Sequence, residues 1–288
     1  MGIKNTEHLF EIPWNNDPAL LEAIKPYRDK ISCVFLPCAV NHGMCTENNI
    51  GTDVESVKQS IELIQHAGFN PCVLMQRNFK TEFFSFYKDL GVKYYTVGED
   101  ATAEFIREKL GNDAYLIASL TKDLVNEDYE IYAENKPSLY DVFILHFRYS
   151  RDIESIMNLP KSLKYGLTAN LMCLWNCKAY RTHWFCQSES YIDIDVRKYA
   201  CHKQRGNGVD VDLDKVNYIK PEDIWLFDPY FETYKITHRK SPTISIVGNL
   251  KKYIEADVST PDDKTIQETI CRYNIGHNKA ERMGDPIY

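Results

Sequence analysis

Short apolar runs alternate with amphipathic stretches along most of the chain. The runs at 31–38 (ISCVFLPC) and 71–76 (PCVLMQ) are apolar almost throughout, which is typical of parallel strands buried on both faces. The stretches between runs, such as 53–68, instead carry apolar residues at helical spacing. We expect strands at 9–14, 31–38, 71–76, 93–98, 114–119, 142–147, 164–170 and 232–239.

Local signals mark where helices begin and end. Asp17 followed by Pro18 predicts the first turn of a helix, with the aspartate as N-cap. Gly68 predicts the end of the helix that begins near residue 53. Each expected strand is therefore followed, after a few residues, by a helix.

Eight strand-then-helix units predict a parallel sheet with right-handed crossovers. Their number and combined length favour a single (β/α)8 barrel, and a doubly wound open sheet is the alternative. We expect the barrel to span residues 1–258. A cysteine-rich metal-binding insertion is expected at 171–220, after the seventh strand, and a polar C-terminal appendage at 259–288.

Barrel enzymes carry their chemistry at the C-terminal ends of the strands. A single polar side chain at this position more often belongs to a solvated loop or to the packing of the protein than to a functional site. The candidates are Trp14, Asn15, Cys38, His42, Cys45, Gln76, Asn78, Glu99, Ser119, His146, Arg148, Asn170, His238 and Arg239. From these, and from the insertion, we expect substrate contacts by Trp14, Asn15, Gln76, Asn78, Asn170 and Arg181.

Composition narrows the class of protein. The net charge of −7, from 34 basic and 41 acidic residues, makes nucleic acid an unlikely partner. No apolar run is long enough for a membrane span, and the N-terminal MGIKNTEHLF is too polar for a signal peptide. Nine cysteines without such a signal indicate a reducing compartment, so we expect a cytoplasmic protein.

Four of the nine cysteines, Cys173, Cys177, Cys186 and Cys201, fall between residues 164 and 202. The spacing of Cys173 and Cys177 places both on one face if the segment is helical. Four thiolates suit a [4Fe–4S] cluster or structural zinc, and the wide spacing of the second pair favours the cluster. Four unrelated buried thiols are the plainer alternative, but the segment is too polar for simple core.

Other residues near these cysteines leave the ligand set open. His183 is a candidate ligand, acid–base group or substrate contact, and Arg181 a candidate clamp for a carboxylate. Cys38 or Cys45, in the loop after the second strand, is an alternative ligand to Cys186 or Cys201. The chain has no glycine-rich phosphate loop, no G-x-S-x-G elbow and no H-E-x-x-H motif.

The pattern Asn170, Cys173, Cys177, Arg181, His183 resembles the cysteine motif of the collagenase-like peptidase U32 family, with the last spacing one residue shorter. Three other segments are similar to that family. They are WNNDPALLEAI at 14–24, FRYSRDIESI at 147–156 and YIKPEDIWLFDPYFETYKITHR at 218–239.

The resemblance implies a TIM-like barrel with a [4Fe–4S] cluster on cysteines. It also implies oxygen-independent hydroxylation, with prephenate as an oxygen donor in several members. Lys178 stands where the family usually has proline after the second cysteine, which puts the ligand set in doubt. In the closing segment, His238 stands where the family usually has glycine. The chain also lacks the long C-terminal extension of RNA-modifying members, so a small or carrier-bound substrate is expected.

Three functions therefore compete. The first is an iron–sulfur hydroxylase in which His183 and Arg239 position substrate or move protons and Arg148 meets an anionic group. The second is a metal-dependent peptidase, which needs a nucleophile–base pair or an open metal site. The third is a non-catalytic iron–sulfur subunit of a heteromeric enzyme, and a homo-oligomer is equally compatible with the sequence.

Overall fold

A computed structural model describes residues 8–43, 52–175, 177, 213–256 and 261–274. Eight parallel strands close into a barrel in the order β1-β10-β7-β6-β5-β4-β3-β2, which confirms the predicted (β/α)8 barrel over the open sheet. The barrel strands are β1 (Leu9–Pro13), β2 (Ile31–Pro37), β3 (Pro71–Met75), β4 (Tyr94–Val97), β5 (Tyr115–Ala118), β6 (Val142–Ile144), β7 (Tyr165–Thr168) and β10 (Thr233–Lys235).

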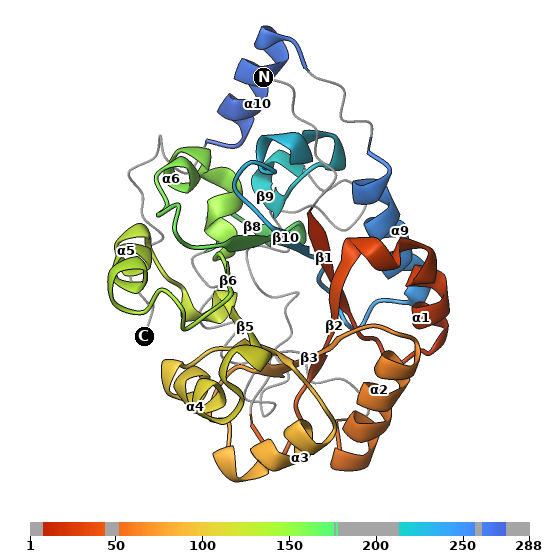
Figure 1. The fold of residues 1–288 in the computed structure, drawn as a ribbon. Helices are drawn as coiled ribbons and strands as arrows, with labels where there is room; N and C mark the ends of the chain where they lie inside the picture. The colour runs from red at the N-terminus through yellow and green to blue at the C-terminus, as the bar shows by residue number, and fades with distance from the viewer. Residues whose placement is uncertain (1–7, 44–51, 176, 178–212, 257–260, 275–288) are drawn as a thin grey trace.

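Helices surround the ring of strands, and α10 lies apart from the ring at one edge of the molecule (Figure 1). The α-helices are α1 (Ala19–Ile24), α2 (Val54–His66), α3 (Phe84–Asp89), α4 (Asp100–Leu110), α5 (Asn126–Asn135), α6 (Ile153–Met157), α9 (Thr243–Ile254) and α10 (Asp263–Arg272). The 3-10 helices are η1 (Lys25–Lys30), η2 (Thr81–Phe83), η3 (Gly111–Asp113), η4 (Leu120–Lys122), η5 (Phe147–Arg151), η7 (Leu213–Lys215) and η8 (Pro221–Leu226). None of these described helices has the length and apolar character needed to cross a membrane.

The predicted helix boundaries hold where side chains fix them. The carboxylate of Asp53 caps α2 by accepting a hydrogen bond from the backbone N–H of Ser56 at 2.9 Å, and Gly68 follows that helix with φ of 82°. Helix α1 begins at Ala19, later than predicted from Asp17 as N-cap, although Asp17 Oδ1 still accepts a hydrogen bond from Ala19 N at 3.0 Å.

The strand predicted at 164–170 is in fact two elements. The barrel strand β7 ends at Thr168, and Asn170 begins β8 (Asn170–Leu174), which pairs antiparallel with β9 (Val216–Tyr218). The insertion after β7 therefore opens and closes with a two-stranded sheet beside the barrel. We call β8 and β9 together the ribbon.

The described part of the expected C-terminal appendage is anchored to the rest of the protein at η8. Tyr273, which follows α10, is fully buried, and its hydroxyl donates a hydrogen bond to Asp223 Oδ2 at 3.0 Å. The same hydroxyl accepts a hydrogen bond from the backbone N–H of Lys220 at 2.9 Å. Arg272 adds an ion pair to Asp223 at 2.7 Å.

Close backbone packing at the end of β4 requires a glycine. A Cβ on Gly98 would lie 1.9 Å from the carbonyl oxygen of Gln76. We expect Gly98→Ala to lower the free energy of unfolding by about 2–3 kcal/mol, because the clash is with backbone and requires β3 and β4 to separate. Urea unfolding measures the change.

The matched control is Gly248→Ala in α9, where a Cβ would meet nothing within 4 Å. This variant should gain about 0.5–1 kcal/mol, since alanine is the better helix former. Equal stability of the Gly98→Ala protein and the wild type would contradict the predicted clash.

Candidate active site at the barrel mouth

The carboxyl ends of the eight parallel strands form one end of the barrel, which we call the mouth. Because the strands are parallel, the segments that follow them meet at this end. Of the residues predicted to bind substrate or to act in catalysis, the structure describes Trp14, Asn15, Gln76, Asn78, Asn170, Arg148 and Arg239. Their substrate-binding and catalytic roles stay predictions.

Two of the predicted asparagines already bind protein groups. Asn15 Nδ2 donates to the carbonyl of Ser241 at 3.2 Å and to Thr243 Oγ1 at 3.1 Å, which ties the loop after β1 to the start of α9. Asn170 Oδ1 accepts hydrogen bonds from the N–H of Thr237 at 2.7 Å and its hydroxyl at 3.0 Å, which joins β8 to the segment after β10. Their amide groups therefore shape the mouth.

The remaining predicted contacts differ in exposure. Trp14 and Arg239 are buried, with 2% and 3% of their surfaces exposed. Asn78 is exposed and has a positive φ of 48°, and its backbone N–H donates to Glu99 Oε2 at 3.1 Å. Gln76 is half-buried, and its carbonyl packs against Gly98.

A cluster of His146, Asp123 and Arg148 lies where the chain leaves β5 and β6. Arg148 Nη2 forms an ion pair with Asp123 Oδ1 at 2.6 Å and also donates to the carbonyls of Asp123 and Leu124 at 3.2 and 3.1 Å. His146 Nδ1 accepts a hydrogen bond from the backbone N–H of Arg148 at 3.3 Å. In neutral His146 the proton is therefore on Nε2, which lies 3.6 Å from Asp123 Oδ1. His146 can therefore hold a proton on Nε2 beside the Asp123 carboxylate, which the ion pair with Arg148 holds in place.

Sequence reasoning named His146 and Arg148 but missed Asp123. The signal available was the residue's place in LTKDLV, directly after the fifth strand. Asp123 adopts a left-handed backbone conformation with φ of 53°, which aspartate tolerates better than most residues.

Cys173 and Cys177 are at the mouth, but the helix assumed for them is wrong. Cys173 lies on strand β8, and Cys177 follows a turn in which its backbone N–H donates to the carbonyl of Leu174 at 3.2 Å. Both side chains are half-buried, and both pack against the small apolar cluster of Phe147 and Leu171. A strand and a turn, and no helix, therefore place the two cysteines against the same apolar pair.

The rest of the predicted ligand set cannot be placed in the same way. Cys186, Cys201, Arg181 and His183 fall within 178–212, outside the described residues, as does Cys45. Cys38 is described and buried, and a Cβ on Gly43 would lie 3.4 Å from its Sγ. Within the described part of the chain, no group of three or more His, Cys, Asp or Glu residues is placed to hold a metal ion.

The ribbon rests on Arg151, a residue that sequence reasoning did not single out. This arginine is fully buried at the end of η5, with its guanidinium over the ring of Tyr273 at 4.6 Å. It donates to the carbonyl of Val216 from Nε at 2.9 Å and from Nη2 at 2.7 Å, and to that of Tyr218 at 3.1 Å. The carbonyl of Leu213 is a further acceptor.

A second link joins η5 to Cys173. Ser150 Oγ donates to Asn217 Oδ1 at 3.0 Å, and Asn217 Nδ2 donates to the carbonyl of Cys173 at 3.1 Å. The segment after β6 thus sets the position of the strand that carries this cysteine.

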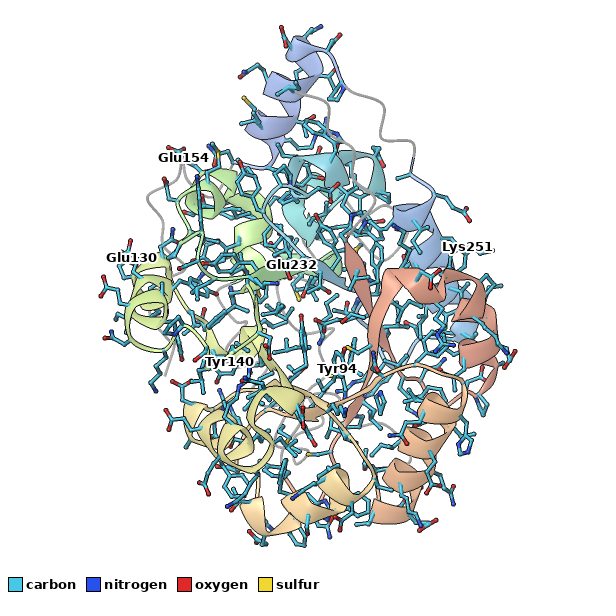
Figure 2. All side chains as sticks on the ribbon, viewed as in Figure 1. Tyr94, Glu130, Tyr140, Glu154, Glu232 and Lys251 are labelled. Carbon is cyan, nitrogen blue, oxygen red and sulfur yellow. The ribbon has the colours of Figure 1, made fainter. Side chains whose placement is uncertain are left out.

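The barrel interior also contains charge, which the sequence analysis missed. Glu11 of β1 and Lys235 of β10 form an ion pair at 2.8 Å between Nζ and Oε2, with 0% of Glu11 and 7% of Lys235 exposed. Barrel interiors are usually filled by branched apolar side chains, so a buried ion pair is unusual there. Tyr94 of β4 also lies within the ring of strands (Figure 2), and its ring packs on that of Tyr115 at 4.9 Å.

No protein-family model matches the chain, and no curated protein matches its sequence. Among solved structures, N-(5'-phosphoribosyl)anthranilate isomerase from Pyrococcus furiosus is similar with a TM-score of 0.46 and 8% identity, covering 86% of this chain and 97% of that chain. The YdjI aldolase from Escherichia coli K12 has a TM-score of 0.44 and 9% identity, covering 93% of this chain and 91% of that one. An uncharacterized Bacillus cereus protein has a TM-score of 0.44 and 11% identity, and the match covers 86% of this chain and 66% of that one. The barrel assignment depends on the strand order of this chain itself.

Proposed function

We propose that this chain is a (β/α)8-barrel enzyme of the peptidase U32 type that binds a [4Fe–4S] cluster at the mouth of the barrel. Its reaction would be oxygen-independent hydroxylation, or a related redox modification, of a small or carrier-bound organic substrate. The observation that carries the proposal is the placement of Cys173 and Cys177, two half-buried cysteines on the segment after β7 that pack against the same apolar pair.

The environment of the two thiols fits a cluster. Cys33 and Cys72 are fully buried in the barrel, whereas Cys173 and Cys177 are half-buried beside a segment that contains two more cysteines. Thiolates are the usual ligands of iron–sulfur clusters, and apolar neighbours limit solvent access to the metal. Cys186 and Cys201 would complete the set, and the bound cluster would supply one-electron transfer.

The chain's own residues at the mouth would bind and orient the substrate. Within the described residues, the side-chain hydrogen bonds of Arg148 all come from Nη2 and go to Asp123 and Leu124, so its Nε and Nη1 groups would bind an anionic group of the substrate. Asp123 would hold the guanidinium in place, and His146 would hold a proton on Nε2. Arg239 and His183 would position the substrate or move protons, as the sequence analysis predicts.

Metal analysis after anaerobic purification tests the cluster. We expect a brown protein with broad visible absorption and about four iron atoms per chain. Cys173→Ala and Cys177→Ala should each lose most of the iron, because each would remove a thiolate ligand. The matched control is Cys271→Ala, since Cys271 is exposed on α10 and should be irrelevant to iron content.

Two outcomes would argue against the proposal. Zinc without iron in the anaerobic protein would exclude the cluster and favour the structural or hydrolytic metal site. Full iron content in both Cys173→Ala and Cys177→Ala would show that these thiols are not ligands.

A further inference from the structure

The charged pair inside the barrel belongs to a row of polar residues on three neighbouring strands. Glu11 is in register with Lys235, and Lys235 is in register with Thr168 of β7. Residues on either side of Glu11 and Lys235 face outward, since Phe10 and Tyr234 pack on each other and Phe10 packs on Tyr253 of α9. The alternation of strand side chains therefore places the row inside the barrel.

Two atoms of this row are buried with no hydrogen-bond partner among the described residues. They are Oε1 of Glu11, whose side chain is fully buried, and Oγ1 of Thr168, which is 1% exposed. A buried polar atom normally has a hydrogen-bond partner. Burying a carboxylate oxygen without one carries a particularly high free-energy cost. This pattern is characteristic of a place where a further polar group binds.

The row lies at the mouth end of the barrel. Thr168 and Lys235 are the last residues of β7 and β10, and the ribbon with Cys173 begins just after β7. The ammonium of Lys235 also lies over the ring of Phe35 at 4.0 Å, so an aromatic surface borders the row. The row therefore lies where β7 and β10 end at the mouth.

Charge indicates which chemical group suits the row. Glu11 and Lys235 neutralise each other, so an added ion would compete with one member of the pair. The neighbouring Cys33 adds no charge, because its hydrogen bond with Cys72 and its burial raise the pKa of the thiol. Glu11 Oε1 can only accept a hydrogen bond, whereas the Lys235 ammonium can only donate.

We propose that Glu11, Lys235 and Thr168 form a binding subsite for an uncharged group that carries both a donor and an acceptor, such as a carboxamide or a hydroxyl. The donor of the ligand would meet Glu11 Oε1 and its acceptor would meet Lys235 Nζ. The subsite rests on the proposed function only in that it lies at the same mouth of the barrel. Its ligand chemistry is independent of the metal.

Acetamide is a suitable probe, since it has one amide donor group and one carbonyl acceptor. Crystals of the anaerobically purified full chain soaked in acetamide should show its nitrogen at Glu11 Oε1 and its oxygen at Lys235 Nζ. In solution, ligand-observed NMR should show binding at least about tenfold weaker in Glu11→Met/Lys235→Met than in the wild type. Glu11→Gln keeps the side-chain volume and should weaken acetamide binding similarly. This single variant replaces the double variant in the measurement if the double variant does not fold.

Several results would overturn the subsite. An ordered water alone at Glu11 Oε1 in the soaked crystal would show a structural water. Equal acetamide binding by the variants would show an adventitious additive only. Iron content separates this proposal from the cluster, because Glu11→Gln should keep its iron while Cys173→Ala should keep its acetamide site.

Discussion

Replacing Arg151 with alanine is expected to destabilise the protein by about 3–4 kcal/mol and to release the ribbon from the barrel. The guanidinium is fully buried and donates to the carbonyls of Leu213, Val216 and Tyr218, while its face covers the ring of Tyr273. Its removal leaves buried carbonyls unpaired and opens a cavity, and both effects are large in a packed interior. Urea unfolding measures the loss.

Two further variants separate the causes of this loss. Arg151→Lys keeps the positive charge but loses the planar guanidinium group with its several donors. We therefore expect its free energy of unfolding to lie between those of Arg151→Ala and the wild type. Arg77→Ala removes an exposed arginine from the same end of the barrel and should change stability by less than about 0.5 kcal/mol. Hydrogen exchange at 170–174 and 213–218 should accelerate in Arg151→Ala. Unchanged exchange there would show that the ribbon is held by other contacts.

The barrel could be predicted from the sequence because its signals are local. A strand buried on both faces appears as an unbroken apolar run, and β2 and β3 lie where 31–38 and 71–76 predicted them. Capping is equally local, since Asp53 bonds to the N–H of Ser56 three residues away. Closure of the ring follows from the number of units, and β1 and β10 pair as that closure requires.

The geometry of the cysteines could not be predicted because the partner of their strand is distant. The spacing of Cys173 and Cys177 fits one helical turn, yet Leu174 pairs with Val216, far along the chain. Asn170 also begins the strand by accepting hydrogen bonds from Thr237. Such non-local pairing overrides a pattern that spans only a few residues.

The interior ion pair escaped prediction for a related reason. Glu11 lies within LFEIP, where the apolar neighbours determine the strand and conceal which face the carboxylate is on. Its partner Lys235 comes from the other end of the chain and becomes adjacent only when β1 and β10 close the barrel. The inward alternation of both strands was the available signal, and it requires the closed ring to be interpreted.

Asp100, at the start of α4, joins three segments on the outside of the barrel. Its carboxylate accepts hydrogen bonds from Lys122 Nζ at 2.6 Å, Tyr132 OH at 2.7 Å and Tyr140 OH at 2.9 Å, and Lys136 Nζ lies at 3.3 Å. The Lys122 side chain is only 9% exposed. Loss of the carboxylate would leave a buried ammonium and two phenol groups without their acceptor.

We expect Asp100→Ala to lower the free energy of unfolding at neutral pH by about 2–3 kcal/mol, because breaking a mostly buried ion pair is more costly than breaking an exposed one. Glu104→Ala is the matched control on the same helix. Glu104 is 54% exposed and forms an ion pair with the partly exposed Lys136, so its loss should cost less than about 1 kcal/mol. Equal losses of unfolding free energy in the two variants would contradict the proposed role of Asp100 in joining the three segments.

Acid should remove the same contribution from the wild type. Partial burial alone would raise the pKa of Asp100, but the hydrogen bonds from Lys122 and the tyrosines hold it at about 2, below the ordinary value of 3.8. A folded-state pKa below the unfolded one means that the stabilisation is present above pH 3.8 and is lost as pH falls towards 2. The difference in unfolding free energy between the wild type and Asp100→Ala should therefore be constant near neutral pH and shrink between about pH 4 and pH 2. A difference that is unchanged at pH 2.5, measured by urea unfolding in both proteins, would show that this network does not lower the pKa of the Asp100 carboxyl.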